Sequence, residues 1–136
     1  MAWNLDKAVE HLRKHAQPKS TGKCAHYTRE AIEAGGVVLV RHGSAKDYGI
    51  SLLHAGFRET IANQYVKGDV VVIQGFQGHP HGHMAMYDGS KWISDFAQSG
   101  LYPGPAYREK KPSYKIYRYG LLWDGIQKPQ AGAAYA

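Results

Sequence analysis

The stretch Thr21-Gly-Lys-Cys-Ala-His-Tyr-Thr-Arg-Glu-Ala-Ile-Glu-Ala-Gly-Gly36 contains the only cysteine of the chain, Cys24. Its less polar residues recur at intervals of three and four, which is the spacing of one helix face. The Gly35-Gly36 pair is typical of a left-handed helix end, so the pattern predicts a helix that begins near Cys24. Because a thiol at a helix N-terminus meets free N–H groups and the positive end of the helix dipole, this position favours the nucleophilic thiolate.

The composition limits the classes of protein to consider. A chain of 136 residues is one domain by length, and a single cysteine excludes an intramolecular disulfide. The N-terminal residues lack the basic and apolar regions of a cleaved signal peptide. No apolar run approaches the ~20 residues that span a bilayer. We therefore expect a protein that is made in the cytoplasm without a signal peptide and does not insert into a membrane.

The formal net charge of +6 favours acidic partners such as nucleic acid, anionic lipid or a wall polymer. The basic residues are scattered along the chain apart from the run Arg108–Lys111, and a scattered distribution is usual for a solvated surface. The sequence contains neither a recognition-helix pattern nor an aromatic and basic strand motif. We therefore expect no nucleic-acid partner.

Helical spacing dominates the first part of the chain. Apolar residues predict a helix over residues 5–16, with Asn4 as its N-cap. A further helix is predicted over residues 45–53, with Ser44 placed to cap it. The apolar run Val37–Val40 is too short for a helix and indicates a strand or a buried connection.

The periodicity changes from near four to two in the second half of the chain. Alternation and β-prone residues predict five strands, over residues 57–61, 70–73, 83–87, 91–96 and 114–119. Asp88-Gly89 is the expected hairpin turn between the third and fourth strands, and the Gly-, Pro- and Tyr-rich segment 99–108 is expected to be a loop. Helices followed by strands predict an α+β fold, with N-terminal helices packed on an antiparallel sheet. We expect one domain over residues 1–126 and a poorly ordered tail over residues 127–136.

A cysteine nucleophile needs a nearby imidazole, and the imidazole needs an orienting group on its other nitrogen. His83 begins one strand of the predicted hairpin and Asp95 lies on the other, so the two side chains meet if they share a face. A slip of one residue separates them. We therefore predict acyl transfer in which Cys24 attacks an amide carbonyl, His83 transfers the proton and Asp95 orients the imidazole. The Cys24 backbone N–H is the natural oxyanion donor.

Three segments follow one another along residues 20–96. They read Gly-Lys-Cys-Ala-His-Tyr27, Gly-Asp-Val-Val-Val72 and Gly-His-Met-Ala-Met-Tyr-Asp-Gly-Ser-Lys-Trp-Ile-Ser-Asp95. Together they resemble the NlpC-type and CHAP-type papain-like cell-wall peptidases and amidases. The resemblance implies a papain-like fold and a third polar residue twelve positions after the histidine, which is Asp95 here. It also implies a hydrolase without a cofactor that cleaves amide bonds in peptidoglycan stem peptides or cross-links.

One position departs from the CHAP pattern. Lys23 stands where these enzymes usually carry a glutamine, so the side chain that completes the oxyanion hole is unassigned. A small, basic, single-domain member without a signal peptide resembles the amidase effectors of type VI secretion systems. That resemblance implies a cognate immunity protein and action in the periplasm of a target bacterium. The same profile fits a phage lysin or a tail-associated amidase.

Two other interpretations of these residues stay open. His79, His81 and His83 alternate along the chain, and together with Cys24 they are of the type that binds zinc. A proline and a glycine between the histidines favour a loop, and no further motif supports a metal, so we expect none. The alternative of another class is a basic binding module without catalysis. The joint presence of Cys24, His83 and Asp95 is the argument against it.

Overall fold

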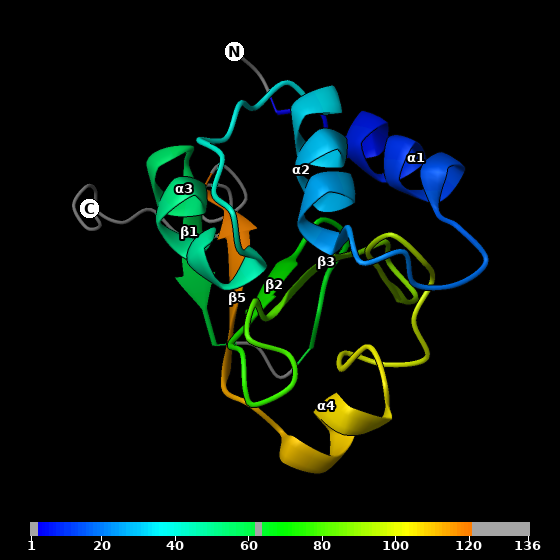
Figure 1. Ribbon diagram of the computed structural model, residues 1–136. Helices are drawn as coiled ribbons and strands as arrows, with labels where there is room; N and C mark the ends of the chain where they lie inside the picture. Colours follow the sequence, from blue (N-terminus) through cyan, green and yellow to red (C-terminus); the bar gives the residue numbers. More distant parts are fainter. Residues whose placement is uncertain (1–2, 62–63, 121–136) are drawn as a thin grey trace.

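The computed structural model describes residues 3–61 and 64–120. Its elements are, in chain order, α1 (Leu5–His15), α2 (Cys24–Ala34), the 3₁₀ turn η1 (Ala45–Asp47), α3 (Gly49–His54), β1 (Phe57–Thr60), β2 (Val70–Ile73), β3 (His83–Tyr87), β4 (Trp92–Ile93), α4 (Pro105–Lys110) and β5 (Tyr114–Tyr119). Figure 1 shows α1 and α2 side by side next to the sheet, with α4 at the lower end of the molecule. The predicted α+β class is confirmed, and the tail expected over residues 127–136 lies outside the described residues.

The five strands form one antiparallel sheet in the order β1-β5-β2-β3-β4. Side chains of a strand alternate between the two faces of a sheet, and all four residues of β2 are buried, so both of its faces are covered. Val70 and Val72 belong to the large hydrophobic cluster that includes α1 and α2. Val71 and Ile73 belong to a second cluster that includes Tyr107 of α4. The central strands β2 and β3 therefore lie between two packed layers.

Helix α1 forms as predicted. The Asn4 side chain caps the helix by accepting a hydrogen bond of 3.0 Å from the Lys7 N–H. Ala8, Val9 and Leu12 are almost fully buried in the cluster that α1 shares with α2. Complete burial of a valine or leucine side chain stabilises a fold by about 2 kcal/mol. This apolar face therefore fixes α1 against α2.

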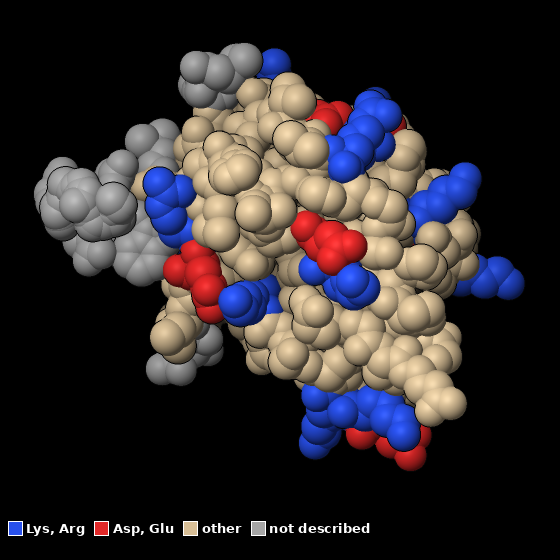
Figure 2. Space-filling model, turned by 60° about the vertical axis from the view of Figure 1, so that its left-hand side comes forward, with Lys and Arg blue, Asp and Glu red and all other residues tan. Residues whose placement is uncertain are grey.

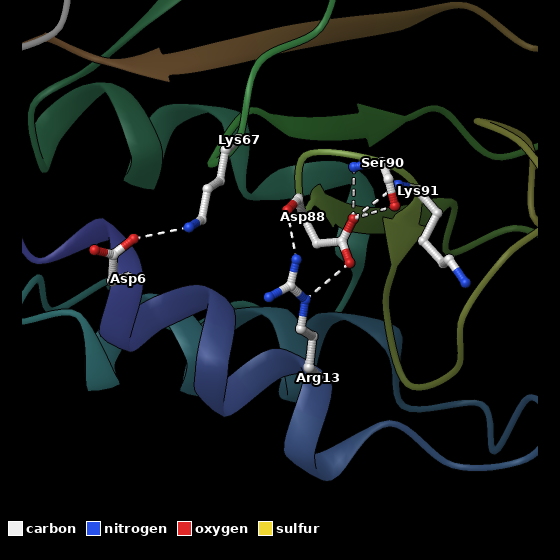
Figure 3. Close-up of polar contacts among 6 residues, drawn as sticks. All are labelled: Asp6, Arg13, Lys67, Asp88, Ser90 and Lys91. Carbon is white, nitrogen blue, oxygen red and sulfur yellow. Dashed lines mark hydrogen bonds and ion pairs between the residues drawn. The ribbon is translucent and has the colours of Figure 1, made fainter.

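Polar contacts attach α1 to the turn between β3 and β4 (Figure 3). Arg13 donates hydrogen bonds from Nε to Asp88 Oδ2 and from Nη2 to the Asp88 carbonyl, both at 3.0 Å. The other carboxylate oxygen of Asp88 accepts from the backbone N–H groups of Ser90 and Lys91, at 2.8 and 2.7 Å. Asp88 therefore closes the predicted Asp-Gly turn and also holds the turn against α1.

The segment between α2 and β1 differs in part from its prediction. Residues 37–40 form an extended connection in which buried and exposed side chains alternate. The single helix predicted over residues 45–53 is divided into η1 and α3. Ser44 precedes η1 but its side chain does not cap it, because the hydroxyl instead contacts His81 Nδ1 at 2.6 Å.

The returning strand of the hairpin is shorter than predicted. The strand expected over residues 91–96 contains only the two residues of β4. The chain turns directly after β4, because the Ser94 N–H donates to the Phe96 carbonyl at 3.0 Å and Ala97 forms a bridge with Ile93. The residues after position 93 therefore do not continue the ladder opposite β3.

The segment 99–108, expected to be a loop, ends in the helix α4. Pro105 stands at the first helical position, where its fixed φ suits the helix and its missing N–H costs nothing. Tyr107 is the buried residue of this short helix. The sheet therefore carries a helix at its lower end that the Gly, Pro and Tyr composition did not predict.

Candidate active site

A cleft of about 800 Å³ lies between the start of α2 and four loops. Its walls come from residues 20–29, 41–48, 79–83, 95–96 and 103–107. Cys24, His83 and Asp95 all line this cleft. The structure therefore brings the three residues selected from the sequence into one cavity, although they lie far apart along the chain.

Cys24 is the first residue of α2, as predicted. The preceding residue, Lys23, makes no side-chain cap, so N–H groups of the first helical turn are left for another partner. The Thr28 hydroxyl one turn further along α2 donates to the Met84 carbonyl of β3 at 3.3 Å. Helix α2 thus holds its cysteine next to the strand that carries His83.

The thiol of Cys24 does not have the low pKa that its helix position suggested. Burial raises the pKa of Cys24 to about 11, and the charge of Asp95 acts in the same direction. Hydrogen bonds with the backbone of Met84 and Ala25 lower the pKa but do not outweigh burial. The expectation of a favoured thiolate is therefore wrong for the free protein, because desolvation penalises the anion more than the helix start stabilises it.

His83 is the first residue of β3 and is 7% exposed. Its Nε2 lies 2.7 Å from Oε1 of Gln98. The amide nitrogen of Gln98 donates to the carbonyls of Gly100 and Leu101, at 3.0 and 3.1 Å. Because those two bonds fix which end of the amide is nitrogen, Oε1 accepts and Nε2 of His83 carries the proton. The remaining nitrogen, Nδ1, is then the basic one.

Burial lowers the pKa of His83, although the Gln98 hydrogen bond and the charge of Asp95 raise it. An imidazole with a lowered pKa is neutral at neutral pH. Cys24 and His83 therefore line the resting cleft as a neutral thiol and a neutral imidazole. A neutral imidazole is chemically able to accept a proton from a thiol.

Asp95 does not make the expected contact with His83. Its Oδ2 accepts from the Thr21 N–H at 2.6 Å, the Thr21 hydroxyl at 2.9 Å and the Lys23 N–H at 3.3 Å. Its Oδ1 accepts from the Ser94 hydroxyl at 3.0 Å. The predicted pairing assumed that the strand continued to residue 96. Because β4 ends at residue 93, Asp95 turns toward the loop before α2.

The pKa of Asp95 is lowered by its environment. Burial acts to raise the pKa, but the hydrogen bonds from Thr21, Ser94 and Lys23 together outweigh burial. The carboxylate is therefore ionised at neutral pH. Its charge acts on both catalytic candidates, since it raises the pKa of His83 and the pKa of Cys24.

Gln98 is the site residue that the sequence did not reveal. Its backbone N–H donates to the Trp92 carbonyl at 2.8 Å, and this bond places the side chain beside His83. The only signal in the sequence is a polar residue at the edge of a Gly- and Pro-rich segment. That signal is shared by many exposed loop residues, whereas Gln98 is buried.

The other histidines of the cleft have separate partners. His81 contacts the Ser44 hydroxyl, whereas His79 packs against Phe76 and Tyr107 with ring centroids 5.0 and 5.2 Å apart. Within residues 3–61 and 64–120 no three histidine, cysteine or carboxylate side chains are grouped to hold a metal ion. The zinc interpretation therefore finds no ligand set in the described part of the chain.

The surface carries few acidic side chains on the face shown in Figure 2, and those are next to basic ones. Basic side chains gather at the lower end, where α4 lies. The helix and the residue after it contribute Arg108, Lys110 and Lys111, all of them exposed. Among the described residues, no helix is both long and apolar enough to cross a membrane.

Two solved structures are close to this chain. The chain is similar to the effector in the native type VI effector-immunity complex Tae3-Tai3 from Ralstonia pickettii, with 57% identity, coverage of 86% of this chain and 99% of that chain, and a TM-score of 0.82. The selenomethionine form of the complex gives 60% identity, coverage of 82% and 98%, and a TM-score of 0.79. In both comparisons the matched region covers almost the whole of the relative's chain.

A more distant likeness concerns the fold alone. The crystal structure of Ly7917 matches with 16% identity, coverage of 86% of this chain and 63% of that chain, and a TM-score of 0.54. A second structure of Ly7917, with the hydrolyzing product of MDP, matches with 18% identity, coverage of 82% and 62%, and a TM-score of 0.50. No family model and no curated protein matches the chain.

Proposed function

Because the chain belongs to the Tae3 family of type VI secretion effectors, we propose that it is a cysteine-dependent amidase that hydrolyses amide bonds in bacterial peptidoglycan. One observation carries the proposal: Cys24 and His83 line the same cleft, and Gln98 fixes the tautomer in which His83 is a base. The papain-like NlpC or CHAP class belongs to the same proposal. It is supported by the motifs around Cys24 and His83 and by the packing of the cysteine helix on the histidine strand.

The proposed reaction starts from the neutral pair. His83 Nδ1 takes the thiol proton as Cys24 Sγ attacks the amide carbonyl, so that the S–C bond forms and the carbonyl electron pair moves to oxygen. N–H groups at the start of α2 stabilise that oxyanion. His83 then gives its proton to the leaving nitrogen as the C–N bond breaks. Water, deprotonated by His83, hydrolyses the thioester and restores Cys24.

The proposed role of Asp95 is divided between two residues. Gln98 holds the imidazole, which is the task that the sequence assigned to Asp95. Asp95 contributes electrostatically, because its negative charge stabilises the imidazolium that forms during the reaction. It also fixes the loop that leads into α2 through Thr21 and Lys23. We retain Asp95 as a positioning residue of the site on this basis.

The proposed biology follows from the relatives, which were solved as effector-immunity complexes. We expect a cognate immunity protein that binds this chain, and secretion into the periplasm of a target bacterium, where peptidoglycan is exposed. Family membership favours this interpretation over a phage lysin. The expected result is toxicity when expression is directed to the periplasm and survival when the immunity protein is co-expressed. Equal toxicity of a cytoplasmic form would contradict it.

The direct test is digestion of purified peptidoglycan with identification of the fragments by mass. Cys24→Ala should reduce the rate by about 10⁴-fold or more, since loss of a nucleophile removes the covalent route. His83→Ala should have a comparable effect. Gln77→Ala is the matched control, because Gln77 is exposed and does not line the cleft. If the Cys24→Ala protein released fragments at the wild-type rate, the cysteine mechanism would be overturned. If the wild type released none, peptidoglycan would be ruled out as the substrate.

A further inference from the structure

Tyr107 is one of the polar residues of the cleft that the proposed reaction does not use. Tyr107 lies on α4, lines the cleft and is 6% exposed. Its ring contacts three others, with centroid distances of 4.9 Å to Phe76, 5.2 Å to His79 and 5.9 Å to His83. These contacts hold the ring in one position beside the proposed base.

The ring of Tyr107 is buried but its hydroxyl is reached by solvent, because among the described residues only His11 Nδ1 is a fully buried side-chain atom without a hydrogen-bond partner. No residue in the described part of the chain forms a side-chain hydrogen bond with it, whereas the hydroxyl of Tyr102 donates to the Pro112 carbonyl at 2.8 Å. Tyr48 likewise contacts the backbone of His42. An unpartnered hydroxyl in a cleft wall is available to a bound substrate.

The protonation state of this hydroxyl suits a hydrogen-bond donor. Burial raises the pKa of Tyr107 to about 12, and the charge of ionised Cys24 adds to the effect. The phenol therefore keeps its proton at any pH at which the protein works. Its electrostatic coupling with Cys24 agrees with the position of both groups in the same cleft.

We propose that the Tyr107 hydroxyl is a side-chain donor of the oxyanion hole, where it acts together with the N–H groups at the start of α2. This inference rests on the proposed function. When Cys24 Sγ bonds to the amide carbon, the carbonyl π electrons become a lone pair on oxygen, and the Tyr107 O–H donates a hydrogen bond to that oxygen without transferring its proton. Tyr107 thus supplies the donor that Lys23, in place of glutamine, left unassigned.

The test compares Tyr107→Phe with Tyr102→Phe. Phenylalanine at position 107 keeps the three ring contacts and removes only the hydroxyl, so the melting temperature should match that of the wild type. With a peptidoglycan-derived cross-linked peptide as substrate, kcat should fall by about 10²-fold in Tyr107→Phe, with KM changed by less than about threefold. Tyr102→Phe removes a hydroxyl outside the cleft and should keep the wild-type kcat.

A second measurement separates an effect on the oxyanion from an effect on the thiol. Alkylation of Cys24 by iodoacetamide forms no oxyanion, so its rate should be equal in Tyr107→Phe and wild type. A parallel fall in alkylation and kcat would show that Tyr107 acts on the Cys24–His83 pair and would overturn the inference. A kcat within twofold of wild type would also overturn it while leaving the proposed function intact. A wild type that does not cleave the peptide would instead contradict the proposed function itself.

Discussion

The two ends of the β3–β4 hairpin both carry a hydrogen-bonded aspartate, but the two carboxylates differ in what they hold. At the turn end, Asp88 binds N–H groups two and three residues away and one side chain of α1. At the open end, Asp95 binds the loop before α2, 72 to 74 residues away in sequence. The first carboxylate therefore stabilises a local turn, and the second joins distant parts of the chain around the proposed nucleophile.

The two ends of the hairpin also differ in the solvent exposure of the groups that bind the aspartates. The partner of Asp88 is an Arg13 side chain that is 53% exposed, and exposed ion pairs contribute little to stability. Both aspartates are buried, but the partners of Asp95 are backbone N–H and hydroxyl groups of Thr21, Lys23 and Ser94. We therefore expect the open end of the hairpin to be more sensitive to substitution than the turn end. Of the five predictions below, those for Asp95 and Arg13 test that order directly.

Asp95→Ala should have the largest effect on stability. The substitution leaves the donors of Thr21, Lys23 and Ser94 without their shared acceptor, and charge-assisted hydrogen bonds are among the stronger ones. We expect a loss of about 4 kcal/mol in the free energy of unfolding, measured by urea denaturation. Asp95→Asn keeps one acceptor oxygen and should lose less. Equal stability of Asp95→Ala and wild type would remove the distinction between the two ends.

Gln98→Ala should affect activity more than stability. It removes the group that holds Nε2 of His83 and so releases the tautomer and the ring orientation. We expect kcat to fall by about 10²-fold, which is about 3 kcal/mol in the activation barrier, while the free energy of unfolding falls by about 1 kcal/mol. The exposed Gln77→Ala serves again as control. If kcat were retained, Gln98 would be only a structural residue.

The pKa of Cys24 predicts alkaline destabilisation. The folded protein holds this proton more tightly than an unfolded chain, because the pKa is about 11 against an ordinary value of 9.0. The resulting stability is complete below pH 9 and is lost as the pH rises through 11. Two pKa units correspond to about 2–3 kcal/mol. Cys24→Ser does not titrate here, so it should lose correspondingly less stability between pH 9 and 11, measured by urea denaturation at each pH.

The same pKa predicts the reactivity of the free protein. Alkylation of the single cysteine should accelerate by about tenfold per pH unit between pH 7 and 9, because the thiolate is the reactive form. Mass spectrometry of the intact protein measures the rate. A rate that is already constant at pH 7 would mean that the thiolate is present at rest, as the helix position alone suggested.

Arg13→Ala should have the smallest effect. The side chain is half exposed, so the loss of its bonds to Asp88 should cost less than about 1 kcal/mol. The matched control is Lys67→Ala, which removes the more exposed pair with Asp6 shown in Figure 3 and should change stability even less. A cost for Arg13→Ala as large as for Asp95→Ala would contradict the proposed difference between the two ends.

The sequence predicted the elements whose causes are local. The cap at Asn4, the start of α2 at Cys24 and the Asp88-Gly89 turn all depend on residues within one or two turns of each other, and each is present. The five strands were also predicted, because alternation and β-branched residues are local signals. The positions of Cys24 and His83 in one cleft followed from these elements.

The predictions that failed concern features that depend on contacts between distant residues. The end of β4 is set by the bridge of the chain to Gln17 and by the Ser94 turn, which no local pattern reveals. As a result Asp95 turns to Thr21, and Gln98 takes the place beside His83. The prediction that Cys24 favours the thiolate failed for a related reason. Helix position is visible in a sequence, whereas burial depends on the whole fold.

The neutral state of the Cys24 thiol has a consequence for the proposed nucleophile outside the cytoplasm. With a pKa of about 11, only about one Cys24 in ten thousand is a thiolate at pH 7. Peroxide, disulfides and thiol-oxidising proteins all react with the thiolate. The resting protein should therefore resist oxidative inactivation in an oxidising compartment. In the proposed mechanism, the sulfur becomes reactive chiefly when His83 takes the thiol proton.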